Sequence, residues 1–202
     1  MRKKILITLL LCIPFISIIL AIIFRLTAMP TNEEIISELR GIKCYKTNVE
    51  YIVKNTRGEE REETIQYYSE EKGARIDFGE DRIKFYKDGN IKVKDNISNK
   101  EYNVDEELDV LHSLTFVKNL LSYPIKEGSI KEGQEEWGDR IYIELDLELF
   151  LENDHLNQAK VFIDKKEKTP IGAIVYDKEG NDRLRIIYKN FEKLKEIDND
   201  LL

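Results

Sequence analysis

The sequence predicts an α+β protein: an antiparallel, half-barrel sheet of about nine or ten strands that wraps a helix, preceded by a transmembrane helix. Three observations predict this architecture. Runs in which apolar and polar residues alternate, the period of a half-buried strand, occupy both ends of the region beyond residue 30. Between them, residues 110–121 follow the period of a helix, whose apolar stripe needs the concave face of a sheet to cover it. An uncharged apolar run precedes the whole region.

Residues 1–29 are predicted to form a cytoplasmic stub and a membrane anchor. The uncharged apolar run begins at Ile5 and ends at Phe24, which is long enough to cross a bilayer as a helix. Basic residues at positions 2–4 precede it, so residues 30–202 are expected to form the extracytoplasmic domain of a single-pass protein of the cell membrane. The run is long for a signal peptide, and Cys12 lacks a proper lipobox. Cleavage and lipidation are therefore the alternatives to a retained anchor.

The extracytoplasmic region is strongly acidic and contains a single cysteine. All 39 acidic residues lie in it, whereas four of the 32 basic residues precede it, which leaves 28 basic residues and a net charge of −11. This charge argues against a nucleic-acid partner and against attraction to anionic lipid headgroups. Cys44 has no second extracytoplasmic cysteine to pair with, so we expect a buried thiol, with an intermolecular bridge as the alternative.

The first elements of this region are a short amphipathic helix and a series of strands. A capping-box pattern at Thr31 and Glu34 starts the helix, and Gly41 ends it. Its apolar face consists of Ile35, Ile36 and Leu39. Alternation and glycine- or asparagine-containing turns then predict strands. These strands cover residues 45–53, 65–68, 74–78, 83–86 and 91–93, with a brief one around Tyr102.

The period then changes to that of a helix and later returns to that of strands. The apolar stripe of the predicted helix consists of Val110, Leu111, Leu114, Val117 and Leu121. Acidic residues at positions 105–107 favour its start, and Pro124 stops it. Residues 128–138 are predicted to be a loop or a ragged strand. Clear alternation resumes at 141–147, and residues 159–191 predict three consecutive antiparallel strands, the last two joined by a hairpin turn at Gly180 and Asn181.

Patterns typical of catalysis are absent from the sequence. Its two histidines, His112 beside the helical stripe and His155 in a polar loop, have no zinc-binding frame around them. No nucleophile elbow, phosphate-binding glycine loop or dinucleotide fingerprint occurs. The acidic residues around Gly180 fit a hairpin turn better than a calcium loop. We therefore expect no enzyme, with no catalytic residue, no metal site and no cofactor.

The sequence offers one candidate partner-binding site. Leu149, Phe150 and Leu151 interrupt the polar alternation next to a loop, where an apolar cluster can be exposed to a partner. The alternative is that these three residues fold into the edge of the sheet. An aromatic residue flanked by aliphatic ones is a common composition for an interface hot spot. Their predicted role is thus protein binding.

The order of the elements and several short motifs resemble known proteins. The stretch AKVFIDKKEKTPIGAIVYDKEGNDRLRIIYKNF at residues 159–191 resembles the LolA-like lipoprotein-carrier fold. The motifs QYY at 66–68, RIDF at 75–78 and YKDGNI at 86–91 resemble the clostridial GerS-like family of spore-germination lipoproteins. The resemblance covers the chain from about residue 31 onward, and Cys12, without a lipobox, departs from the lipoprotein pattern.

This resemblance implies a non-catalytic accessory protein of sporulation and germination in the forespore or spore envelope. Such a protein binds and activates a cell-wall N-acetylmuramoyl-L-alanine amidase that modifies the spore cortex. The alternative function is a carrier that holds a lipid or another apolar ligand in the concavity of the half-barrel. A carrier needs an apolar cavity, whereas the predicted helix fills the concavity, so binding to an amidase is the favoured hypothesis. A homodimer is left open.

Overall fold

The computed structural model describes residues 14, 17–18, 30–134, 137–151, 153–198 and 200–202. The chain divides into two compact units, Met1–Thr31 and Asn32–Leu202, and the description below concerns the second. The predicted anchor between Ile5 and Phe24 lies, apart from three positions, outside the described residues. Within the described part of the chain, no helix has the length and apolar character needed to span a membrane.

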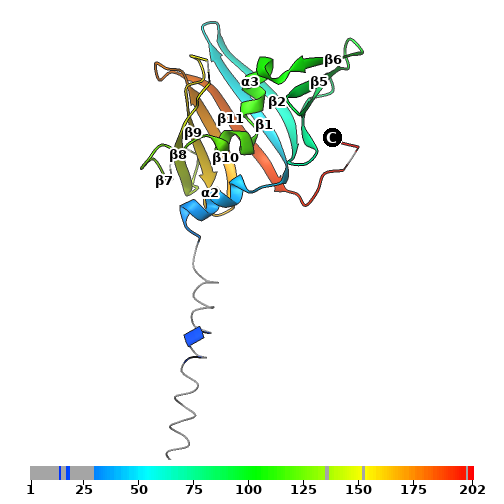
Figure 1. Ribbon diagram of the computed structural model, residues 1–202. Coiled ribbons are helices and arrows are strands. Elements are labelled where there is room, and N and C mark those ends of the chain that lie inside the picture. Colours follow the sequence, from blue (N-terminus) through cyan, green and yellow to red (C-terminus); the bar gives the residue numbers. More distant parts are fainter. Residues whose placement is uncertain (1–13, 15–16, 19–29, 135–136, 152, 199) are drawn as a thin grey trace, which may run out of the picture. The chain divides into compact units, whose positions relative to one another are not determined.

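One open antiparallel sheet of eleven strands curves around a few short helices (Figure 1). The strand order is β6-β5-β4-β3-β2-β1-β11-β10-β9-β8-β7. The first and last strands are therefore neighbours in the middle of the sheet, and each half of the chain extends outward from them. The strands are β1 (Cys44–Asn55), β2 (Gly58–Ser69), β3 (Gly73–Phe78), β4 (Arg82–Lys87), β5 (Asn90–Asp95), β6 (Lys100–Asp105), β7 (Lys131–Gly133), β8 (Tyr142–Glu148), β9 (Gln158–Asp164), β10 (Thr169–Tyr176) and β11 (Asp182–Lys193).

The strands β1, β3, β5 and β8 form where alternation predicts them, because each buries alternate side chains in the core. The predicted three-strand unit at residues 159–191 is confirmed: β9, β10 and β11 pair antiparallel in sequence order. The predicted count of about nine or ten is too low, since the stretch at 128–138 contributes the short strand β7. Cys44 is buried and free, which confirms the predicted buried thiol.

The predicted continuous helix over residues 110–121 is wrong. The structure has a 3-10 helix η1 (Glu106–Asp109), then α3 (Val110–Leu114) and α4 (Val117–Ser122). Phe116 separates α3 from α4 with an extended backbone (φ −64°, ψ 127°), and its buried ring joins a second core cluster under β3, β4 and β5. Burial of this ring compensates for the helical hydrogen bonds that the break removes.

Buried polar side chains satisfy the backbone groups that the break leaves free. The Tyr188 hydroxyl donates to the Thr115 carbonyl at 2.7 Å, and the Val117 N–H donates to the Tyr45 hydroxyl at 3.0 Å. The Gln66 amide donates to the Thr115 hydroxyl at 2.8 Å. Unpaired buried backbone groups would cost free energy, so strands from the middle of the sheet make the broken helix stable.

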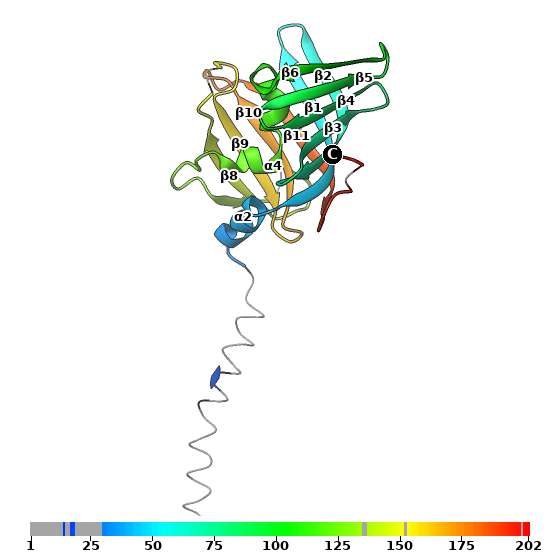
Figure 2. The same ribbon diagram turned by 45° about the vertical axis from the view of Figure 1, so that its right-hand side comes forward.

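The N-terminal helix α2 (Asn32–Arg40) lies across one end of the sheet, at the bottom in Figures 1 and 2. Its predicted apolar face is confirmed, since Ile35, Ile36 and Leu39 are buried in the main core. The Arg40 Nε donates to the Leu121 carbonyl at 2.8 Å, which caps the end of α4. The main core therefore lies between the concave face of the sheet and α2, α3 and α4.

Part of the convex face is covered as well. Phe162 is fully buried, and Trp137 and Tyr142 pack on it with ring centroids 5.1 Å and 5.5 Å away. A Cβ atom at Gly172 would come within 2.8 Å of Trp137 and within 2.5 Å of the Ile186 carbonyl oxygen. Only glycine therefore allows the indole to approach β10 this closely.

Candidate functional site

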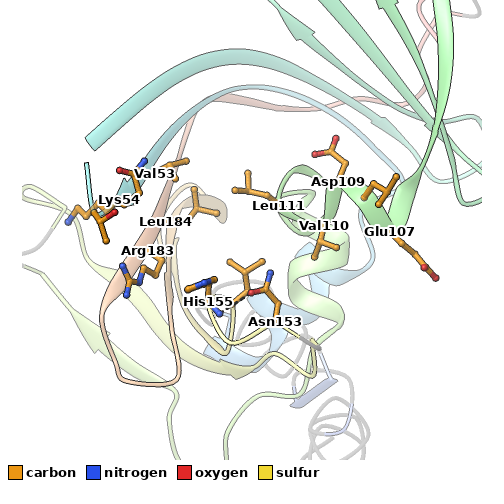
Figure 3. Close-up of a pocket in the computed structure, with 14 residues that line it drawn as sticks. Val53, Lys54, Glu107, Asp109, Val110, Leu111, Asn153, His155, Arg183 and Leu184 are labelled. Carbon is orange, nitrogen blue, oxygen red and sulfur yellow. Dashed lines mark hydrogen bonds between the residues drawn. The ribbon is translucent and has the colours of Figure 1, made fainter. Parts of the chain in front are cut away.

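A cavity of about 660 Å³ opens at the end of the half-barrel where η1 and α3 face the middle of the sheet (Figure 3). Its apolar walls come from distant parts of the sequence. Val53 and Leu184 are directly opposite each other on β1 and β11, and Leu111 on α3 points toward them. Leu156, from the loop between β8 and β9, adds a further wall. The expectation that the helix fills the concavity is therefore wrong at this end.

Charged groups surround the cavity, and those on β1 and β11 are paired. Lys54 forms an ion pair with Asp182 at 2.8 Å, and Arg183 forms one with Asp177 at 2.6 Å. Hydrogen bonds from Asn181, and also from Arg183 and the Glu179 N–H, lower the pKa of Asp177 against the opposing effect of burial. Because these groups donate to its carboxylate, the acidic turn is a hairpin turn held by Asp177. The described residues contain no group of three or more side chains that could hold a metal ion.

A network of charged side chains fixes η1 and α3 to the sheet beside the cavity. The Asp109 carboxylate accepts hydrogen bonds from Lys84 at 2.6 Å, from Tyr86 at 2.7 Å and from the His112 Nδ1 at 2.6 Å. The side chains of Lys84, Asp109 and His112 are each at most 15% exposed. The Tyr51 and Phe78 rings pack against the imidazole in T-shaped arrangements, with centroids 5.3 Å and 5.1 Å from its own.

This environment shifts the pKa values of the network in opposite directions. Burial raises the pKa of Asp109, but the hydrogen bonds from His112, Lys84 and Tyr86 outweigh it and hold that pKa well below its usual range. Burial lowers the pKa of His112, but its hydrogen bonds to Asp109 and Glu62 outweigh this effect and leave the pKa above its ordinary value of 6.5. The stable form of this network therefore has an ionised Asp109 beside a protonated His112.

We expect His112 to make the stability of the domain depend on pH. Because its pKa is raised in the folded state, its contribution is complete below pH 6.5 and is lost as pH rises through the folded pKa. Chemical unfolding of the wild type and of His112→Gln at several pH values measures this contribution. The difference in unfolding free energy between the two should shrink as pH rises above neutrality. A constant difference would mean that the imidazole is not charged in the folded protein.

Sequence reasoning placed His112 beside the helical stripe but missed its partners. Asp109 and His112 are three residues apart, a spacing that brings side chains together on a helix, and this was the available signal. Lys84 and Tyr86 come from β4, more than twenty residues earlier, so no local pattern links them to Asp109.

Comparison with known proteins assigns the chain to a family. The family model described as "Sporulation protein YdcC-like" matches residues 2–202. The chain belongs to the YdcC-like sporulation protein family. This membership confirms the resemblance to sporulation proteins that the sequence motifs indicate. No protein with a curated description matches the chain.

One solved structure shares the fold of this YdcC-like protein, and others align with it at lower TM-scores. An uncharacterised conserved protein from Thermus thermophilus aligns with a TM-score of 0.55 at 10% identity, over 84% of this chain and 91% of that one. One chain of the solved structure of the CwlD amidase from Clostridioides difficile in complex with the GerS lipoprotein aligns with a TM-score of 0.46 at 19% identity, over 82% of this chain and 98% of that one. The LolA superfamily protein NE2245 from Nitrosomonas europaea aligns with a TM-score of 0.40 at 11% identity, over 85% and 96%.

The predicted partner-binding residues of this YdcC-like protein follow β8 and have different environments. Leu149 is buried in the main core, and Leu151 packs against the same core from a half-buried position. Phe150 between them is 73% exposed. The three residues therefore do not form one exposed apolar cluster, because both leucines are needed to close the core. The loop that they begin continues into the cavity wall with His155 and Leu156.

Proposed function

We propose that this YdcC-like protein is a non-catalytic accessory protein of sporulation that binds and activates a cell-wall N-acetylmuramoyl-L-alanine amidase. Membership of the YdcC-like family supports a role in sporulation. The resemblance of the sequence motifs to GerS-like proteins supports an amidase as the partner. The observation that carries the proposal is Phe150, an aromatic side chain presented to solvent on an acidic domain. Its neighbours Leu149 and Leu151 are fixed in the core, so binding would order little additional chain.

The proposal places the domain outside the cytoplasm, held at the cell membrane by the apolar run between Ile5 and Phe24. A net charge of −11 on residues 30–202 would favour a partner with a basic surface and would speed association at low salt. Carbonate extraction of membranes tests the anchor, since a peripheral protein would be released by that treatment.

Replacing Phe150 by alanine should weaken amidase binding by at least ~1–2 kcal/mol, because truncation removes a central aromatic contact. The side chain is exposed, so the melting temperature should stay unchanged. The measurement is a titration against the amidase encoded in the same genome, with a thermal melt of each variant. Ile141→Ala, which also truncates an exposed apolar side chain, is the matched control and should bind like the wild type. Equal binding by Phe150→Ala would place the interface elsewhere.

The cavity supports a second candidate function, the carriage of an apolar ligand. Its volume of about 660 Å³ falls within the range of ligand pockets, roughly 300–1,000 Å³, and the aliphatic side chains of Val53, Leu111 and Leu184 form part of its walls. Native mass spectrometry of the purified chain should then show a bound ligand that is absent from Leu111→Trp, in which an indole occupies the cavity. Ile141→Trp adds the same ring away from the cavity and should keep the ligand. A wild-type chain without bound mass would exclude the carrier function under those conditions.

A further inference from the structure

Two neighbouring hollows, with volumes of about 200 Å³ and 430 Å³, lie beside η1 and α4. Glu106 and Asn119 line both of them, so the two hollows form one groove. The first hollow is lined by three aromatic side chains, and the second by three aliphatic side chains and a tyrosine. These residues are Tyr68, Tyr86 and Phe116 in the first hollow, and Val110, Leu114, Leu151 and Tyr123 in the second. Leu151 follows the exposed Phe150, so the groove reaches the loop that presents this side chain.

The charges that line this groove are almost all negative. Its carboxylates are those of Glu70, Glu71, Asp88, Asp105, Glu106 and Glu107. Lys87 is the one basic residue among the described residues that line it. Lys118 and Arg40 lie close by, but Lys118 forms an ion pair with Glu70, and Arg40 donates to carbonyl groups at the end of α4. Apart from Glu70, these carboxylates have no ion-pair partner within the part of the chain that the structure describes.

The lysines of the neighbouring strands do not neutralise the groove. Lys92 and Lys94 flank Val93, which is buried in the second core cluster, so their side chains lie on the opposite, convex face of the sheet. Lys84 is on the concave face, but Asp109 holds its ammonium group at 2.6 Å. The carboxylates of the groove are therefore left to attract a cation from outside the domain.

Capping of η1 explains only part of this acidic lining. The Asp105 carboxylate accepts a hydrogen bond from the Glu107 N–H at 3.0 Å, and the start of a helix favours negative charge. However, η1 has only four residues, and Glu70, Glu71 and Asp88 come from turns of the sheet, between β2 and β3 and between β4 and β5. A cleft lined by charges of one sign concentrates their field and attracts the opposite charge. The groove is therefore suited to cationic groups.

We infer that this groove binds a segment of a partner protein in which lysine or arginine residues are interspersed with apolar ones. The inference rests on the proposed function and names the chemistry of the segment that the partner contributes. Its cationic groups would meet the carboxylates, and the aromatic rings of the first hollow attract cations as well. Its apolar side chains would cover the second hollow. A free metal ion or polyamine would leave that apolar lining uncovered, so a protein segment fits better.

A capped peptide of alternating lysine and valine serves as the probe, titrated against the full-length chain in mild non-ionic detergent. We expect binding that weakens as the salt concentration rises. Glu71→Gln combined with Glu107→Gln removes one exposed carboxylate from each hollow and should weaken binding at least about fivefold. Glu127→Gln combined with Glu196→Gln is the matched control and should bind like the wild type. It changes the net charge equally at exposed residues that do not line the groove.

Several results of this titration would overturn the inference. These are no binding of the peptide by the wild type, equal losses in the two double variants, or equal binding of a peptide of alternating glutamate and valine. Complete competition by spermidine at the concentration of the peptide would show that the groove takes free polyamines. A wild-type dimer that the Glu71→Gln/Glu107→Gln variant dissociates would show that a second copy of the chain occupies it.

The same variants, titrated against the amidase encoded in the same genome, separate this inference from the proposed function. Glu71→Gln/Glu107→Gln should weaken amidase binding by a similar factor, and the control variant should not. If the amidase binds this variant as tightly as the wild type, the inference fails and the proposed function stands. If the amidase does not bind the wild type, the proposed function fails, and the peptide titration still decides whether the groove takes basic segments.

Discussion

Replacing Leu114 by aspartate should destabilise the domain by about 3–5 kcal/mol, the range for an uncompensated charge in a core. Leu114 on α3 is 4% exposed and packs in the main core beneath the sheet. An aspartate there would lose its hydration without gaining a partner, or would have to protonate. A thermal melt of the variant beside the wild type measures the effect.

Leu108→Asp is the matched control for this prediction. Leu108 lies on η1, only six residues before Leu114, but its side chain is 79% exposed. The same substitution there should change the unfolding free energy by less than about 0.5 kcal/mol. If the two variants melt together at the wild-type temperature, α3 is not packed under the sheet.

Replacing Asp109 by alanine should cost about 2–4 kcal/mol, because it leaves Lys84 and His112 partly buried without their common anion. The Tyr86 hydroxyl would lose its acceptor as well. Denaturant unfolding measures this loss. Since Asp109 raises the pKa of His112, the variant should also lose most of the pH dependence that His112 produces.

Asp154→Ala provides the control for this second substitution. Asp154 forms an ion pair with Lys178 at 2.6 Å, the same separation as between Asp109 and Lys84. Unlike that pair, the side chains of Asp154 and Lys178 are both largely exposed. Solvent screens such a pair, so the loss should be below about 1 kcal/mol. Equal losses for the two variants would mean that the network adds nothing beyond an ordinary surface pair.

The sequence alone determined most of the secondary structure, because that structure depends on local periodicity. Alternation located the strands at residues 45–53 and 159–191, and a capping pattern with one apolar face located α2. The buried state of Cys44 followed from composition. Phe150 was identified as a candidate from its neighbours, but alternation did not show that Leu149 and Leu151 would close the core.

The tertiary structure decided the features that depend on contacts between distant residues. Local periodicity predicted one helix over residues 110–121, but burial of Phe116 favours a break. The hydrogen bond that the Tyr45 hydroxyl accepts from Val117 and the one that the Tyr188 hydroxyl donates to Thr115 favour it as well. The cavity lies between Leu111 and the strands β1 and β11, which are neighbours only in the folded sheet. The ion network has the same origin, since Lys84 and Asp109 meet across 25 residues of sequence. Such contacts form only when the whole core packs, so no local pattern of the sequence predicts them.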